Sequence, residues 1–419
     1  MRKVLFNVFL VTVLTLSLSM FYDLQVSKAQ SSRDAEIQEL KMEINKLLQR
    51  VETLEQQRAK EKTEEKVKKE EVNADIKSYV DRRIERFSVF PTSKLSITGF
   101  GTFDFVNSAN DPSSFGVSVN PIFNYNVTDR VHFTSELEFE LEDGETNAVL
   151  EIAEADVFLN DYLTLVVGKF LLPFNAFTER LHPTWINKLP SFPLVYQGED
   201  GGPGLLTDLQ DVGAQLRGGA SLPFLYKGAK INYAFYVTNG PQANITEVDG
   251  KEELDVEFNN NFQDLNANKA VGGRVGILPI WNAEVGASFE YADTGHNIDF
   301  FLFGLDGEYH YRGLELRGEY IYEQHDKLTS GNVNNSGLYL QTAYRLSSIV
   351  LPDKQIQQFV NRLEPVVRYD AVYRDAQSDV HGFTVGMDYW LLPTVPIKFA
   401  YEINDNTPSS FLLQLAVGF

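Results

Sequence analysis

The chain contains no cysteine, and it is short of basic residues. With Cys 0, disulfide bonds and thiolate metal sites are excluded. Lys and Arg number 37 against 58 Asp and Glu, a net charge of -21. Proteins that bind nucleic acid generally need a basic surface to neutralise phosphates, so no nucleic-acid partner is expected.

Histidine is also scarce, and it is scattered along the chain. The six His residues are His132, His182, His296, His310, His325 and His381. No motif pairs any of them with a nucleophile or groups them as metal ligands. The sequence therefore predicts neither an enzyme nor a protein that needs a cofactor or a metal ion.

Long apolar runs are absent beyond the N-terminus. Arg2 and Lys3 precede the mostly apolar segment 4–20, and Val26-Ser27-Lys28-Ala29 has small residues where a signal peptidase cuts. We expect a signal peptide over residues 1–29. A retained helical anchor is the alternative.

Residues 31–87 lack glycine and proline and are dense in charged residues. Apolar residues alternate at spacings of three and four, which is a heptad seam with β-branched residues at position a and leucine at position d: Ile37, Leu40, Ile44, Leu47, Val51 and Leu54. We expect residues 30–87 to form a coiled coil and linker. The local code favours two strands.

From residue 95 to the C-terminus the hydrophobic period changes to two. The segment VHFTSELEFELED, residues 131–143, places glutamate at every second position from Glu136 to Glu142 and apolar residues between them. Strands of about ten residues with this alternation, joined by alternating short turns and long loops, are typical of a transmembrane barrel. We predict an all-β fold, a sixteen-stranded antiparallel β-barrel over residues 88–419. A soluble sandwich is the alternative.

Two segments disturb this pattern. In the fourth strand, Leu150 and Ile152 lie on the opposite face from Ala155 and Val157, which predicts a β-bulge. The connection 347–362 is long for a turn, so the strand count is open there by one hairpin. The connections at about 172–211 and 239–269 are predicted to be long loops.

In a lipid bilayer the polar face of each strand must point into the barrel. The charged residues on these faces are predicted to line a wet channel: Glu136, Glu138, Glu140, Arg217, Arg274, Arg317, Arg345 and Arg368. The loop 172–211 is rich in Pro, Gly and aromatic residues, and we expect it to fold inward and constrict the pore. Its charged residues would then set the pore charge: Glu179, Arg180, Lys188, Glu199 and Asp200. An ordinary surface loop is the alternative.

The run VGKFLLPFN, from Val167 to Asn175, resembles the GKF-x-x-PF segment of the phosphate-selective O/P-type porins. The overall layout is similar to trimeric bacterial outer-membrane porins, including dicarboxylate porins with an N-terminal coiled coil. This resemblance implies a homo-trimer among outer-membrane lipids, with the coiled coil in the periplasm. The terminal FLLQLAVGF, ending at Phe419, resembles the signal that barrel assembly machinery recognises.

The function that these features predict is passive diffusion of small hydrophilic solutes. Residues 1–87 are nearly balanced in charge, so the acidic excess falls on the barrel segment and favours cations over anions, phosphate included. A structural protein that tethers the envelope to the cell wall through its coiled coil is the alternative.

Overall fold

The computed structural model describes Arg50 and residues 94–419, apart from 110–111, 143–144, 199–201, 208, 227, 249–250, 259–267, 329–330, 376 and 406–407. The chain divides into two units, Met1–Val89 and Phe90–Phe419. The predicted signal peptide and, except for Arg50, the predicted coiled coil lie outside the described residues. The fold described below is that of the second unit.

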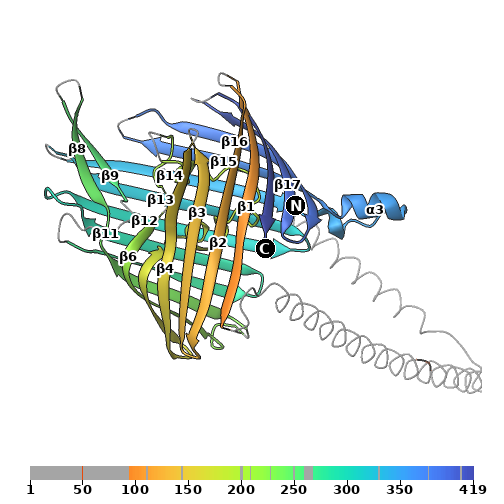
Figure 1. Cartoon of the computed structure of the whole chain (residues 1–419), viewed down its shortest axis with the longest axis horizontal. Helices are drawn as coiled ribbons and strands as arrows, with labels where there is room; N and C mark the ends of the chain where they lie inside the picture. The colour runs from red at the N-terminus through yellow and green to blue at the C-terminus, as the bar shows by residue number, and fades with distance from the viewer. Residues whose placement is uncertain are drawn as a thin grey trace, which may run out of the picture. The chain divides into compact units, whose positions relative to one another are not determined.

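Sixteen strands close into one antiparallel barrel (Figure 1), which confirms the predicted fold class. The last strand pairs with the first, from Phe100 opposite Gly418 to Ser108 opposite Ser410. The strands are β1 (Leu95–Ser108), β2 (Ser114–Thr128), β3 (Val131–Glu142), β4 (Glu145–Asn160), β5 (Leu163–Leu171), β6 (Gln210–Ser221), β7 (Lys230–Thr238), β10 (Ala270–Ile280), β11 (Ala283–Asp293), β12 (Asp299–Tyr311), β13 (Leu314–Asp326), β14 (Asn332–Tyr344), β15 (Leu363–Arg374), β16 (Val380–Leu392), β17 (Val395–Asn404) and β18 (Ser410–Gly418).

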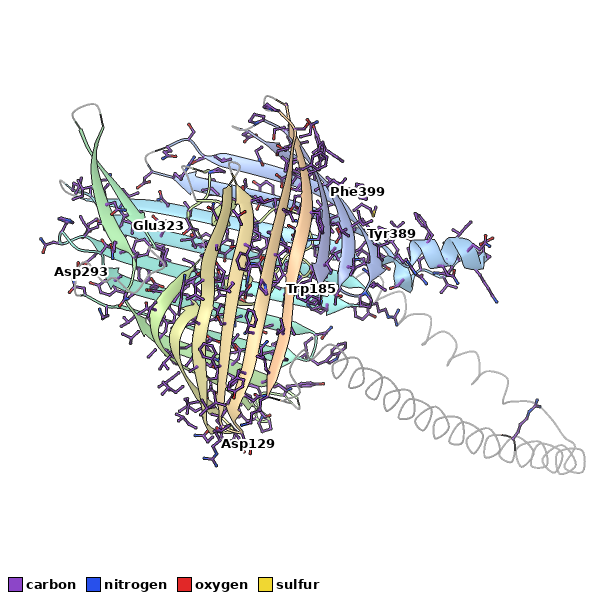
Figure 2. All side chains as sticks on the ribbon, in the orientation of Figure 1. Asp129, Trp185, Asp293, Glu323, Tyr389 and Phe399 are labelled. Atoms are coloured by element: carbon purple, nitrogen blue, oxygen red, sulfur yellow. The ribbon has the colours of Figure 1, made fainter. Side chains whose placement is uncertain are left out.

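The barrel is apolar outside and polar inside. Phe139 and Tyr320 on the outer face are 39% and 37% exposed, whereas the inward-facing Arg317 is 7% exposed. Phe399 and Tyr389, labelled in Figure 2, also lie on outward-facing positions of their strands. A soluble β-sandwich buries its apolar face, so this arrangement excludes that alternative and suits a surface in contact with lipid.

The β-bulge predicted in the fourth strand is present. Glu136 pairs with Ile152 and Leu137 pairs with Leu150, so Glu151 is the extra residue of β4. The bulge places Leu150 on the outer face while Ile152 stays opposite the inward-facing Glu136. The Lys169 ammonium, on the outer face of β5, donates to the Leu150 carbonyl oxygen at 2.7 Å.

The connection between β14 and β15 contains no additional hairpin. It forms the short turn η4 (Leu346–Ser348) and the helix α3 (Lys354–Val360). The Asp353 side chain caps α3 by accepting from the backbone N–H of Gln355 at 2.8 Å and of Ile356 at 3.0 Å. The strand count of the barrel therefore stays at sixteen. Within the described residues, no helix is long and apolar enough to cross a membrane.

The expectation of a plain polar loop over 239–269 is wrong. This connection contains a hairpin of its own, β8 (Gln242–Val248) and β9 (Lys251–Glu257), which forms a separate two-stranded sheet. Cross-strand neighbours such as Ala243 and Val256 give it a small apolar face. The many acidic residues around these positions hide that alternation in the sequence.

The outward-facing residues supply a direct test of the lipid-facing surface. Replacing Val367, on the outer face at the middle of β15, with arginine should lower the free energy of unfolding in a bilayer by about 2–4 kcal/mol, because a charge would enter hydrocarbon. Urea titration of protein refolded into vesicles measures this, with Val367→Leu as the matched control. Equal stability of both variants would contradict a lipid-facing position for this residue.

Candidate functional site

The segment between β5 and β6 lies against the inner wall of the barrel. It contains the single π-helical turn η1 (Phe177–Leu181) and the 3-10 turn η2 (Leu194–Tyr196). Its apolar side chains are buried together with inward-facing apolar residues of β12, β13 and β14: Phe300, Leu302, Ile321 and Tyr339. These wall residues form an apolar seat for the loop.

Carboxylates on the wall also hold the loop backbone. Glu319 of β13 accepts the backbone N–H of Ala176 at 3.1 Å and of Phe177 at 2.8 Å, and the Tyr196 hydroxyl donates to its other oxygen. Asp370 of β15 accepts the backbone N–H of Leu194 at 3.0 Å. A loop without regular secondary structure has unpaired N–H groups, and charged acceptors satisfy them strongly.

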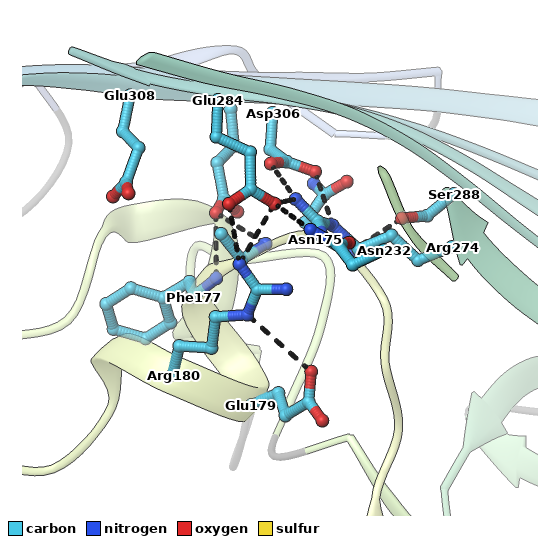
Figure 3. A network of polar contacts seen from close by, with 12 residues as sticks. Asn175, Phe177, Glu179, Arg180, Asn232, Arg274, Glu284, Ser288, Asp306 and Glu308 are labelled. Carbon is cyan, nitrogen blue, oxygen red and sulfur yellow. Dashed lines mark hydrogen bonds and ion pairs between the residues drawn. The ribbon is translucent and has the colours of Figure 1, made fainter. Parts of the chain in front are cut away.

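Two buried networks join loop and wall. In the first (Figure 3), the Arg274 guanidinium donates to Asp306 at 2.9 and 2.6 Å and to Glu284 at 2.9 Å. Arg180 of the loop donates to both oxygens of the same Glu284, at 3.0 and 3.1 Å. Glu284 therefore links the loop to a wall arginine, and three carboxylate oxygens satisfy a guanidinium that is almost fully buried.

The second network lies under the loop segment 184–191. Arg368 donates to Asp370 at 2.8 Å and to the Ser191 carbonyl oxygen at 2.9 Å. Lys398 donates to Gln414 at 2.8 Å and to the Thr184 carbonyl oxygen. These pairings leave little of either basic group for solvent.

Three of the arginines predicted to line the channel are nearly buried. Arg274, Arg317 and Arg368 point inward, but they are only 2%, 7% and 1% exposed. The loop covers the first and the last, and Arg317 pairs with Glu315 on the same strand. The sequence places these arginines on the inner face, but it does not reveal the path of the loop that removes them from open water.

The other predicted basic residues are paired but remain partly open. Arg217 donates to Asp156 at 2.9 Å, and Arg345 donates to Glu364 at 3.0 Å. Lys188 from the loop donates to the same Glu364 at 3.0 Å.

Of the three predicted acidic residues in the loop, the structure describes only Glu179. Glu179 lies 3.8 Å from Arg180 and 3.6 Å from Arg217. Glu199 and Asp200 lie outside the described residues.

A cavity of about 880 Å³, called the acidic cavity below, lies between the loop and strands β1 to β4 and β18. It contains the predicted Glu136, Glu138 and Glu140. Six carboxylates line it, and no lysine or arginine is among its described lining residues: Asp104, Glu136, Glu138, Glu140, Glu151 and Glu402. This cavity is thus strongly acidic, although its Glu402 also lies 3.5 Å from the Arg368 guanidinium. A second cavity of about 290 Å³ is lined by Arg180, Arg217 and Arg274 together with Glu179.

One histidine, His182, lines this cavity. Its Nδ1 atom is buried and has no hydrogen-bond partner among the described residues. Burial lowers the pKa of this imidazole to about 4, so it stays neutral near pH 7 and adds no positive charge.

Some lining residues were missed by the sequence reasoning. Asp104 lies between Phe103 and Phe105, so the alternation of polar and apolar residues along the strand identifies it as inward-facing. Glu151 is the extra residue of the bulge, where that alternation is broken, so the sequence pattern does not assign it to a face. Within the described residues, no group of three or more His, Asp or Glu is placed to hold a metal ion.

Comparisons with known proteins show the fold. No family model and no curated protein matches this sequence. The OmpF of Salmonella typhi in complex with daunomycin is 12% identical, with 78% of this chain and 97% of that chain covered and a TM-score of 0.53. An anion-selective porin from Comamonas acidovorans is 10% identical, with 78% and 99% covered and a TM-score of 0.52. The chain therefore has the closed barrel fold of bacterial porins.

Substitution of Glu319 tests whether its carboxylate holds the loop against the wall. Glu319→Ala should loosen the loop, because two buried backbone N–H groups lose their acceptor at a cost of about 1–3 kcal/mol each. We expect faster tryptic cleavage after Arg180 and Lys188 in the intact barrel, measured by mass spectrometry. Glu308→Ala, which removes a carboxylate outside these contacts, should cleave as the wild type does. Unchanged cleavage in Glu319→Ala would show that this residue does not hold the loop.

Proposed function

We propose that the protein is a passive diffusion channel of the bacterial outer membrane, with small hydrophilic solutes as its cargo. The observation that supports this best is the apolar outer face combined with an ionic interior that keeps an open cavity beside the loop. Such a barrel needs no chemistry: solutes move down their gradient, and width and charge select among them. In this proposal the loop 172–211 is the constriction.

We further propose that the channel prefers cations. The acidic cavity has six carboxylates, and the buried Arg274 and Arg368 are neutralised by pairing with Asp306, Glu284 and Asp370. Lining charges of one sign raise the local concentration of the opposite ion. This argues against the phosphate selectivity that the GKF-x-x-PF resemblance implies, and Lys169 of that motif lies on the outer face rather than in the lumen.

The remaining features are proposals from the sequence: cleavage of the signal peptide, a homo-trimer, a periplasmic coiled coil and recognition of Phe419 by barrel assembly machinery. The Phe419 ring lies on the outer face near Gly99 and is mostly exposed, which leaves it accessible. The envelope tether remains the alternative. Deleting residues 31–87 distinguishes the two functions, because a channel keeps its conductance and a tether loses its effect on the envelope.

Reversal potentials in a KCl gradient across a planar bilayer test the cation preference. The wild type should shift toward the K⁺ equilibrium potential. Glu138→Lys, which places a base in the acidic cavity, should lower the permeability ratio of K⁺ to Cl⁻ roughly tenfold. Glu308→Lys, a matched change outside the cavity, should have a smaller effect. A reversal potential on the Cl⁻ side in the wild type would refute the preference.

A further inference from the structure

We propose that the acidic cavity is a binding site for linear alkyl-diammonium ions, which it binds more tightly than quaternary dications of the same length. This inference rests on the proposed function, because it names the class of solute that the channel would hold. It is carried by the charge of the cavity, by two unpartnered acceptors in its wall and by two aromatic rings that also line it.

The charge of the cavity selects for cations. Its six carboxylates come from four strands, with three of them on β3 and one each on β1, β4 and β17, and none of its described lining residues is lysine or arginine. Because the negative charges lie on different strands, a ligand with more than one positive centre gains more than a single ion does.

Two buried amide oxygens in the wall have no partner among the described residues. They are Asn120 Oδ1 on β2 and Gln210 Oε1 on β6, in side chains that are 3% and 2% exposed. Both residues line the acidic cavity. Buried acceptors are normally satisfied, either by a hydrogen-bond donor or by a cation that coordinates the oxygen. An ammonium group with N–H donors can satisfy both oxygens, whereas a quaternary ammonium ion, whose nitrogen carries only carbon, can satisfy neither.

Two aromatic rings beside these groups suit the apolar middle of an extended dication. Among the described residues, no three carboxylates or histidines are close enough together to hold a metal ion. The loop contributes the rings of Phe177 and Tyr196, which stack with centroids 4.8 Å apart and also line the cavity. Methylene groups between two ammonium ends would contact these rings while the ends reach the oxygens.

Block of the K⁺ current across a planar bilayer tests the proposal with two matched dications. Hexane-1,6-diamine and hexamethonium both carry two charges on six methylenes, but only the diamine has N–H donors. We expect the diamine to block at about tenfold lower concentration than hexamethonium does. The reason is that one hydrogen bond from a charged donor changes an affinity by about that factor. Hexane-1,6-diol, which is neutral, should not block.

Variants then locate the site. Glu138→Gln should raise the half-blocking concentration of the diamine about tenfold. Asn120→Leu should reduce the advantage of the diamine over hexamethonium, because it removes an acceptor and no charge. Glu308→Gln, a carboxylate outside the cavity, should leave the block unchanged, and the K⁺ current of each variant reports that its barrel is folded.

The outcomes separate this inference from the proposed function. Equal block by both dications, or no block while K⁺ current flows, overturns the diammonium site and leaves the channel standing. A folded barrel without K⁺ current refutes the channel and the inference with it.

Discussion

The structure depends on the absence of water in the hydrocarbon layer around the barrel. Every backbone N–H and carbonyl group at that depth must pair within the protein, which only a closed sheet allows among β-structures. Closure from β1 to β18 satisfies the backbone and leaves each strand with one face toward lipid. Since side chains alternate along a strand, the apolar residues take the outer face and the ionic residues are directed inward.

The inward ionic groups then need partners, and the loop between β5 and β6 supplies them over part of the wall. Carboxylates such as Glu319 bind loop N–H groups, and basic groups such as Arg368 and Lys398 bind loop carbonyl oxygens. Along β1 to β4 the acidic cavity separates the loop from the wall instead, and carboxylates such as Glu138 line it. The charge that a solute meets is therefore set by which groups the loop leaves uncovered, more than by the total charge of the lumen.

Much of the barrel was predictable from sequence because its signals are local. The alternation around Glu136 to Glu142 reports which face meets lipid, and the broken parity at Leu150 and Ile152 reports the bulge in β4. The burial of Arg274 and Arg368 was not predictable, because it depends on contacts between residues far apart in sequence. Glu319 is 143 residues from Ala176, whose N–H it accepts, and no local pattern encodes that pairing.

Site-directed spin labelling along β3 tests the inside-out arrangement most directly. Single cysteines at residues 136 to 141, in a chain with Cys 0, would be labelled in bilayers, and their collision rates with O₂ and with a polar nickel chelate would be measured. The account predicts highest O₂ accessibility at Leu137, Phe139 and Leu141 and highest chelate accessibility at Glu136, Glu138 and Glu140. Highest O₂ accessibility at the glutamate positions, or no alternation in accessibility along the strand, would contradict this arrangement.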